Sequence, residues 1–570
     1  MNPPELLAPL AELAMSDGAY GSRQLDLFAT YSATTALRDI EHRPDSHLAT
    51  ARAVLGSAST QGVGETIGAA PDAWSTTYAS GTLLNLGYVA PSGWAAFLTS
   101  LERDGGYSMF PGGDPDAWAT GFAPLALGRL DPAQVNKRKL ARWVGSAQAL
   151  DGGITWTPMD APQEPGDVRA TGFVVDALRQ VDGVHLLGGY LDSEALVAFV
   201  IDQQGRDGGF ALNSRNTPCM WGTAEAATVL DAFEIPIPNR AAVVDFVMSY
   251  FNETTGGFRR GPAFKTGEDV WATRQAVRIL RIVDSERLGV LAPQIGAFLK
   301  SCALPGGGYT YCTIDHAGDV LSTSAAILAG YADGEASSWI QSSVMPDGGF
   351  AYMPGRGAEA RTSQWATAAL DATGSTYDVD ALLTWASRSQ NHDGGFGRWA
   401  GRASEPVPTA AVVATLVRAK RLQNLPGLAT LGNWVDAAIG HLDEGHQDDA
   451  VIGANLVRSA NAITTTSGQQ IDVTPCLRVI NRLGVDGAYR RRARAVPDLA
   501  TTYAVLLAHQ AIGEDRTLAA ARSWLNYLTV FPNGVAWSPA SSEGGGLLAS
   551  ALATLVLNAT DGTTLPDLSL

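Results

Sequence analysis

Residues 151–171 read DGGITWTPMDAPQEPGDVRAT and contain both of the sequence elements that recur along this 570-residue chain. The first element is a glycine turn followed by an aromatic residue. Gly-Gly after Asp provides the positive φ angles of a tight turn, and the aromatic side chain can pack back on neighbouring helices. Other copies are DGAY at 17–20 and 486–489, DGGY at 104–107, and DGGF at 207–210, 347–350 and 393–396, with weaker copies at 255–258, 306–309 and 533–537.

The second element lies downstream of the turn and reads acid-x-x-x-Thr, as from Asp167 to Thr171. Successive copies begin 40 to 52 residues apart, so twelve copies fill the chain from end to end. Self-similarity at such a period is the signature of a repeat architecture. The copies begin at Asp26, Asp72, Asp116, Asp167, Asp269, Asp319, Glu359, Glu405 and Asp498, with degenerate copies at Cys219, Asp449 and Glu543.

Each copy of the second element introduces an alanine-rich, almost wholly apolar segment, such as TAEAATVLDAF from Thr223. An acidic side chain at this point is a good N-cap and complements the positive end of the helix dipole, so we predict that most of these acids are caps. A helix that is apolar on most sides is an inner helix. The segment before each turn is amphipathic instead, with Leu140, Trp143, Val144 and Ala147 at helical spacing in KLARWVGSAQA.

Inner and outer helices that alternate around a ring make an α/α toroid, and six repeats usually close one ring. The sequence therefore predicts an all-α protein with two α/α toroids, built from twelve repeats of an inner and an outer helix. No strand-like alternation competes with this pattern.

Composition and charge disfavour several classes of protein. The net charge is −17, and the longest basic run is the short RRRAR at 490–494, whereas nucleic-acid binding needs a basic footprint. No apolar run reaches the roughly 18 residues of a membrane span. Cys219, Cys302, Cys312 and Cys476 show no recognisable spacing, and the first residues do not look like a signal peptide, so we expect a cytoplasmic protein.

The repeats resemble those of terpenoid cyclases and protein prenyltransferases. The stretches 147–156 and 389–399 look like the Gln-to-Trp repeat of squalene-hopene cyclases, and Asp167-Val-Arg169 is similar to helix starts in prenyltransferase β-subunits. Two rings in one chain resemble the βγ didomain of class II terpene cyclases. The resemblance implies a γ-like toroid at residues 45–300, inserted into a β-like toroid of residues 1–44 and 301–570. It also implies an apolar isoprenoid small molecule as ligand and allows peripheral membrane contact.

Class II cyclases protonate an alkene or epoxide with the central Asp of an Asp-x-Asp-Asp motif at the start of an inner helix. Because an alkene is a feeble base, that acid must be neutral, buried and polarised. No acid stands at the third or fourth position of any copy of acid-x-x-x-Thr, so the usual acid pair is missing. The candidates for a displaced catalytic acid are His446 with Asp448 and Asp449, Asp315 and His316 with Asp319, and Glu268 with Asp269.

Aromatic residues at the third position of five copies are the positive chemical indication. They are candidates for substrate binding, since they could line a cavity and stabilise carbocations through their π faces. Helix packing is the alternative interpretation. These residues are Phe28, Trp74, Trp118, Trp221 and Trp271.

Metal chemistry is not expected. The chain has no DDxxD cluster that would hold Mg²⁺ on a diphosphate. The zinc site of protein prenyltransferases needs an Asp-x-Cys, but Thr217-Pro-Cys219 lacks the Asp, and Cys312 with His316 has no evident further ligands. We therefore expect neither a metal nor another cofactor.

Three functional hypotheses follow. The first is an isoprenoid cyclase of class II type that starts cyclisation or isomerisation by protonation from a non-standard acid. The second is a toroid without catalysis that binds a ligand or a protein. The third, with less support, is a prenyltransferase-like protein.

Overall fold

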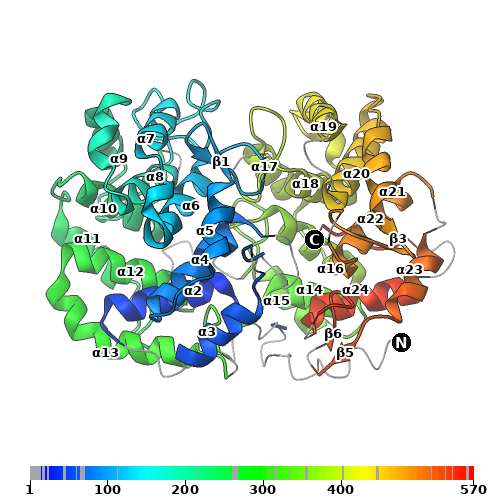
Figure 1. The fold of residues 1–570 in the computed structure, drawn as a ribbon, viewed down its shortest axis with the longest axis horizontal. Helices are drawn as coiled ribbons and strands as arrows, with labels where there is room; N and C mark the ends of the chain where they lie inside the picture. The colour runs from blue at the N-terminus through cyan, green and yellow to red at the C-terminus, as the bar shows by residue number, and fades with distance from the viewer. Residues whose placement is uncertain are drawn as a thin grey trace. The chain divides into compact units, whose positions relative to one another are not determined.

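The computed structural model describes residues 15, 19–21, 25–42, 47–59, 61–64, 71–111, 113–214, 216–259, 267–305, 307–313, 317–332, 334–353, 357–400, 404–443, 449–493, 495–514, 517–532, 534–541, 544–559 and 564–569. Over these residues the chain is mostly helical, as predicted (Figure 1). It divides into two compact units. Unit 1 consists of Met1–Ser22 with Asp315–Leu570, and unit 2 consists of Arg23–Ile314.

Six inner helices close a ring in unit 2. Each packs against the next one along the chain, and the last, α12, packs against the first, α2. Outer helices alternate with them along the chain and pack against them. The inner helices are α2 (Leu27–Asp39), α4 (Ala73–Asn85), α6 (Ala117–Leu130), α8 (Val168–Gln180), α10 (Met220–Ala232) and α12 (Val270–Val283). The outer helices are α3 (His47–Gly56), α5 (Ser92–Thr99), α7 (Lys137–Ser146), α9 (Ser193–Asp202), α11 (Arg240–Met248) and α13 (Ser285–Ser301), with 3₁₀ turns η2 (Pro132–Gln134) and η3 (Val184–Gly189).

Unit 1 contains a second ring of six inner helices, closed by contact of α24 with α14. The inner helices are α14 (Val320–Leu328), α16 (Ala360–Ala372), α18 (Pro406–Arg418), α20 (Ala450–Ser467), α22 (Leu499–Ala511) and α24 (Gly546–Asn558). The outer helices within the described residues are α15 (Gly334–Gln341), α17 (Val379–Ser389), α19 (Leu428–Asp443), α21 (Thr474–Leu483) and α23 (Leu518–Leu525), and η5 (Leu422–Asn424) precedes α19. The prediction of two six-repeat toroids is confirmed.

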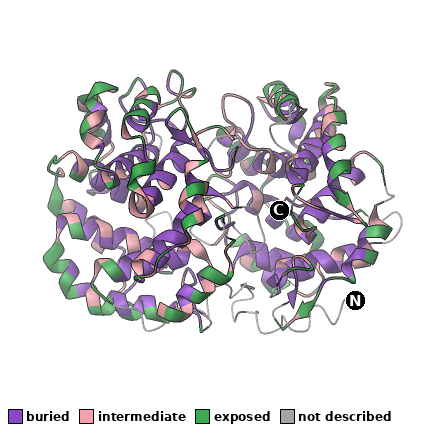
Figure 2. Cartoon of the chain, viewed as in Figure 1, coloured by how far each residue is buried: buried purple, intermediate pink, exposed green. Residues whose placement is uncertain are grey.

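Burial separates the two kinds of helix (Figure 2). Inner helix α10 is buried on nearly every side, whereas outer helix α7 buries only Leu140, Ala141, Trp143 and Val144. This pattern matches the apolar and amphipathic segments that the sequence predicts. Apolar burial of this kind, at roughly 25 cal/mol per Å², is the main force that holds the inner ring together.

The glycine turns connect each outer helix to the inner helix that follows. In three of them the residues around the turn form antiparallel two-residue ladders: β1 (Glu102–Arg103) with β2 (Gly106–Tyr107), β3 (Gly484–Val485) with β4 (Ala488–Tyr489), and β5 (Val530–Phe531) with β6 (Gly534–Val535). At Gly152 φ is +93°, and a Cβ there would lie 2.3 Å from the carbonyl oxygen of Ala195. Glycine is therefore required both by the turn and by the close approach of α9.

The threonine of acid-x-x-x-Thr explains why the two sequence elements recur together. Its hydroxyl accepts a hydrogen bond from the backbone N–H of the turn residue that follows the glycines. In the stretch 151–171 the bond runs from Ile154 to Thr171 at 3.0 Å. Equivalent bonds join Tyr107 to Thr120, Phe210 to Thr223, Phe258 to Thr273, Phe396 to Thr409 and Tyr489 to Thr502, and serine replaces threonine for Phe350 with Ser363. In the last repeat Val535 donates to Ser550, so the acceptor lies three residues beyond the position expected from a copy that begins at Glu543.

Two of these bonds are exchanged between distant repeats, and they show where the chain passes from one ring to the other. Tyr20 donates to Thr323 of α14 at 3.0 Å, and Tyr309 donates to Thr30 of α2 at 2.9 Å. The chain therefore changes unit between a turn and its inner helix. This corrects the expected boundaries of 44/45 and 300/301: α2 closes the unit 2 ring because it packs between α4 and α12. The β-like and γ-like identities of the units stay a prediction.

Candidate functional site

The predicted catalytic carboxylates that the structure describes have structural partners. Asp269 accepts a hydrogen bond from the backbone N–H three residues later at 2.8 Å. Asp319 accepts from the backbone N–H and the hydroxyl of Ser322, at 2.8 and 2.7 Å. Both aspartates are buried N-caps. Glu268 is half-buried and accepts a hydrogen bond from the amide of Asn252 at 2.8 Å.

Asp449 is fully buried and lies between two arginines. Its Oδ2 is 2.9 Å from Arg491 Nε and 3.3 Å from Arg492 Nε, while its Oδ1 caps α20. Both oxygens of this carboxyl group are therefore engaged by donors of the protein, Oδ1 by the first turn of α20 and Oδ2 by the two guanidinium groups. The other members of the predicted acid clusters lie outside the described residues: His446, Asp448, Asp315 and His316.

Asp498 caps the inner helix α22, and the pKa of its carboxyl is shifted. Burial raises the pKa of its carboxyl above the ordinary range, although hydrogen bonds from Thr501 and the charge of Arg491 oppose the shift. Asp449 adds to the increase by like-charge repulsion. The sequence identified Asp498 only as a cap, because its proximity to Asp449 and Arg491 depends on how repeats pack.

Not every acid at the start of an inner helix caps it. Glu359 and Glu405 make no side-chain hydrogen bond to the first turns of α16 and α18. Glu359 instead accepts a hydrogen bond from Arg398 Nε at 2.6 Å. Cys219 takes the cap position of α10, where its sulfur accepts from the backbone N–H of Gly222 at 3.4 Å.

The five aromatic residues singled out in the sequence lie together in unit 2, and we call them the aromatic cluster. Their ring centroids are 6.2 Å apart for Phe28 and Trp74, 6.0 Å for Trp74 and Trp118, 6.1 Å for Trp118 and Trp221, and 5.2 Å for Trp221 and Trp271. All four pairs meet edge to face, a geometry that aromatic quadrupoles favour. Trp118 and Trp271 are buried, and Phe28, Trp74 and Trp221 are half-buried.

Further aromatic residues extend the cluster and were missed by the sequence analysis. Tyr78, Phe122 and Phe173 stack along the ring, with centroids 5.3 Å apart for each neighbouring pair. Tyr78 and Phe122 each lie four residues after a tryptophan of the cluster, on the same helix face. That i, i+4 spacing was the signal that could have identified them.

An arginine already occupies part of the aromatic surface. The Cζ of Arg169 is 5.2 Å from the ring centroids of both Trp156 and Trp221. Its charge is balanced by Asp167, whose Oδ2 is 2.7 Å from Arg169 Nη2. A guanidinium held over these rings uses the π faces that a carbocation would need.

A buried ion network lies in the same ring. Arg278 Nη1 is 3.1 Å from both carboxylate oxygens of Glu225, and its Nη2 is 3.1 Å from Asp176. Arg179 reaches Asp176 at 2.7 Å. Burial alone would raise the pKa of Asp176, but Arg278 and Arg179 outweigh it and hold that pKa below its usual value. Charged residues within otherwise apolar inner helices were the signal that could have identified this network.

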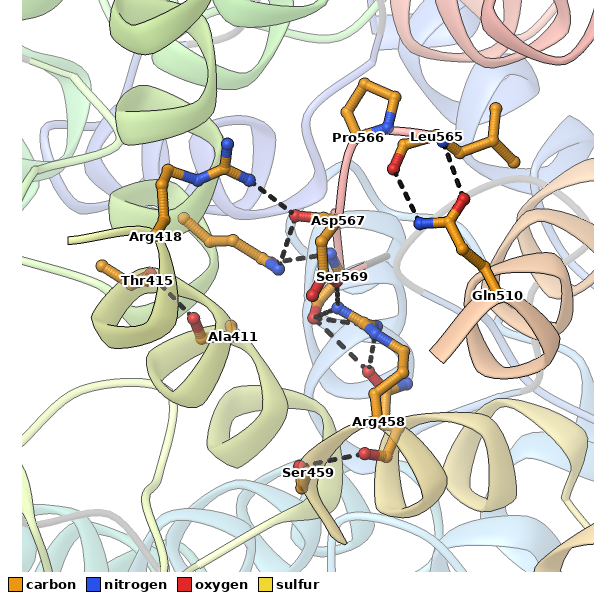
Figure 3. A network of polar contacts seen from close by, with 12 residues as sticks. Ala411, Thr415, Arg418, Arg458, Ser459, Gln510, Leu565, Pro566, Asp567 and Ser569 are labelled. Carbon is orange, nitrogen blue, oxygen red and sulfur yellow. Dashed lines mark hydrogen bonds and ion pairs between the residues drawn. The ribbon is translucent and has the colours of Figure 1, made fainter. Parts of the chain in front are cut away.

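The interior of unit 1 holds residues 565–569, which we call the 565–569 segment (Figure 3). Side chains of α16, α18, α20 and α22 hydrogen-bond to it, and Leu568 and Ser569 are fully buried. The segment therefore lies inside the ring. Nothing in the sequence predicted this placement.

Metal ligands do not cluster in the part of the chain that the structure describes, where no group of three His, Cys, Asp or Glu residues could hold an ion. Burial raises the pKa of Cys219, which disfavours the thiolate needed for zinc. Within the same residues no helix is long and apolar enough to cross a membrane.

Comparison with known proteins identifies the repeat. The family model described as prenyltransferase alpha-alpha toroid domain matches residues 74–218, 212–399 and 325–447. This match confirms the resemblance to the terpenoid cyclase and prenyltransferase superfamily. No curated protein matches the chain by sequence.

Three of the solved structures with a similar fold illustrate the likeness. Protein geranylgeranyltransferase-I of Candida albicans, complexed with GGPP, is 14% identical over 49% of this chain and 92% of its own, with a TM-score of 0.39. The ent-copalyl diphosphate synthase of Streptomyces platensis is 14% identical over 92% of this chain and 98% of its own, with a TM-score of 0.36. The type II terpene cyclase MstE of Scytonema is 15% identical over 50% and 98%, with a TM-score of 0.33. These values are too low to transfer an activity.

Proposed function

Because the chain belongs to the prenyltransferase alpha-alpha toroid domain family, we propose that it is a ligand-binding toroid that holds an apolar isoprenoid small molecule. The ligand lies against the aromatic cluster of unit 2 and leaves chemically unchanged. The observation that carries this proposal is the convergence of Phe28, Trp74, Trp118, Trp221 and Trp271 from five inner helices into one continuous set of rings.

The chemistry of the cluster suits a neutral hydrocarbon chain. Ligand sites are usually lined by apolar and aromatic side chains with few polar groups. Phe28, Trp74 and Trp221 retain exposed surface for contact with a ligand. Arg169 already lies over Trp221 and Trp156, so these faces favour a neutral ligand over a carbocation.

The described acids support binding without protonation. A general acid for an alkene must keep its proton at neutral pH and point it at the substrate. Asp269 and Asp319 accept hydrogen bonds as caps, and Asp449 is paired with two arginines. In each of these three acids the side-chain oxygens already bind donors of the protein.

The proposal is tested with radiolabelled geranylgeraniol, squalene and 2,3-oxidosqualene. Equilibrium dialysis measures binding, and gas chromatography with mass spectrometry measures products in the same samples. We expect saturable binding of at least one compound and recovery of unchanged ligand. Absence of binding to any of the three, or formation of a cyclised product, contradicts the proposal.

A second candidate function is protonation-initiated cyclisation or isomerisation of class II type. The raised pKa of Asp498 favours it, because that buried carboxyl keeps its proton to a higher pH than an ordinary aspartate does. If the assay above yields a product, Asp498→Asn should abolish it, whereas Asp371→Asn on the partly exposed end of α16 should not. Full activity of Asp498→Asn would exclude Asp498 as the acid and leave His446, Asp448, Asp315 and His316 as candidates.

A further inference from the structure

We propose that the interior of the unit 1 ring is a recognition site for an extended peptide, and that the chain's own 565–569 segment occupies this site. The inference does not depend on the isoprenoid ligand proposed for unit 2. It rests on the contacts between inner helices of unit 1 and the segment. These contacts involve both the backbone and the side chains of the segment.

Two amide side chains recognise the backbone as a neighbouring β-strand would. Gln510 donates to the carbonyl of Leu565 at 3.2 Å and accepts from its N–H at 2.8 Å. Gln364 donates to the carbonyl of Asp567 at 2.9 Å and accepts from the N–H of Ser569 at 2.7 Å. Main-chain hydrogen bonds of this kind give affinity for an extended peptide whatever its side chains.

Two more carbonyls of the segment are bound by side chains of the ring. The hydroxyl of Tyr503 donates to the carbonyl of Pro566 at 2.8 Å, and the indole N–H of Trp365 donates to that of Ser569 at 2.9 Å. A buried backbone carbonyl without a partner would cost roughly 1–3 kcal/mol. The ring therefore supplies the hydrogen-bond donors that the backbone carbonyls of an extended chain need in its interior.

Side-chain contacts give the site specificity for an acidic residue between two leucines. Arg458 forms an ion pair with Asp567, and its side chain is only 4% exposed. Leu568 is fully buried and Leu565 nearly so, both within the apolar core of the ring. Figure 3 shows Arg458 and Gln510 directed at the segment from different helices. A buried guanidinium needs an anion, so an occupant without the acid should bind poorly.

Three features indicate that the ring forms without the 565–569 segment and that the segment can leave it. The segment forms neither helix nor strand, and the ring closes through α14 and α24 without it. The Asp567 side chain keeps 44% of its exposure, so water reaches this part of the segment. The buried Nε atoms of Arg418 and Arg458 have no hydrogen-bond partner, so the site retains donors beyond those that the segment uses.

The test uses the full chain with a protease site placed in residues 560–563 and cut after folding. The probe is a fluorescent peptide of sequence TLPDLSL, residues 564–570. We expect the cut chain to exchange its own segment for the probe, measured by fluorescence anisotropy, and the uncut chain to bind no probe. A probe with Asp567→Asn should bind about tenfold more weakly or worse, which is about 1.4 kcal/mol. In an Arg458→Met chain the two probes should bind equally.

Two results would overturn the proposal. One is a cut chain that keeps its own segment and takes up no probe. The other is equal binding of TLPDLSL and a scrambled peptide. A variant that lacks residues 564–570 gives an independent test: if near-ultraviolet circular dichroism shows native packing, it must bind the probe without cleavage, and a folded variant that does not bind contradicts the proposal.

Discussion

Arg278 of unit 2 and Arg458 of unit 1 occupy the same place in two rings built from one repeat. Each lies nine residues after the aspartate that caps its helix, Asp269 or Asp449. Yet Arg278 binds acids of two other inner helices, α8 and α10, whereas Arg458 binds Asp567 of the 565–569 segment. The repeat thus specifies the ring and the direction of its inner side chains. What fills the ring depends on a few residues that differ between repeats.

The largest expected effect comes from removing the arginine whose partners have little access to water. Arg278→Met removes the guanidinium that hydrogen-bonds to both carboxylate oxygens of Glu225, a residue that is 1% exposed. Breaking a buried pair from one side costs about 3–5 kcal/mol. Urea unfolding followed by circular dichroism should show this loss. Arg281→Met on the same helix is the control, since that arginine is half exposed and its pair with Asp39 is worth about 0–1 kcal/mol. Equal effects of the two variants would contradict this account of the network.

The equivalent change in unit 1, Arg458→Met, should lower the free energy of unfolding by less. Arg458→Met leaves Asp567 unpaired, but that carboxylate is partly exposed and can be hydrated. We expect a loss of about 1.5–3 kcal/mol, the usual range for a hydrogen bond to a charged group. The same unfolding measurement applies. A loss greater than that of Arg278→Met would mean that the 565–569 segment is an integral part of the core.

A change in the shared part of the repeat should affect both rings alike. Thr223→Val in unit 2 and Thr409→Val in unit 1 each remove the hydroxyl that accepts the turn N–H of Phe210 or Phe396. We expect a loss of about 1–2 kcal/mol in each variant, since a buried N–H is left without a partner. Thr384→Val on the exposed face of outer helix α17 should change stability by less than about 0.5 kcal/mol. A difference between the two ring variants much larger than 1 kcal/mol would show that the turns are not equivalent.

The smallest expected effect is the contribution of Asp176 in unit 2 to the pH dependence of stability. Arg278 and Arg179 lower the pKa of Asp176 below its ordinary value of 3.8 in the folded chain. The unfolded chain therefore takes up this proton first as the pH falls, so the stabilisation is complete well above pH 3.8 and is lost as the pH drops through the lower folded value. Asp176→Asn should lose less stability than the parent between pH 6 and pH 3.5, measured by urea unfolding at each pH. An identical slope in both proteins would contradict the predicted shift.

The fold was predictable because its signals are local and repeated. The acid that caps an inner helix and the threonine that binds the preceding turn lie within one repeat, as Asp167, Thr171 and Ile154 show. The point where the chain changes ring was not predictable in this way. The turn at Tyr20 pairs with Thr323 and the turn at Tyr309 pairs with Thr30, although each turn is followed in sequence by an inner helix of its own.

The candidate site was predictable only in part, because only some of its contacts follow from positions within one repeat. Phe28, Trp74, Trp118, Trp221 and Trp271 share one helix position, so their convergence follows from the ring itself. The partners of the acids do not follow from helix positions. Asp449 meets Arg491 and Arg492, which lie in the loop before the next inner helix, and sequence alone could not distinguish this paired carboxylate from a proton donor.

The central claim is that the aromatic cluster of unit 2 binds the isoprenoid, and matched tryptophan variants test it most directly. Equilibrium dialysis with radiolabelled geranylgeraniol compares the parent chain with Trp221→Ala in the cluster and Trp434→Ala on outer helix α19 of unit 1, each confirmed as folded by thermal unfolding. The account predicts at least about tenfold weaker binding for Trp221→Ala, equivalent to about 1.4 kcal/mol, and unchanged binding for Trp434→Ala. Unchanged affinity in Trp221→Ala, or no saturable binding by the parent chain, would contradict it.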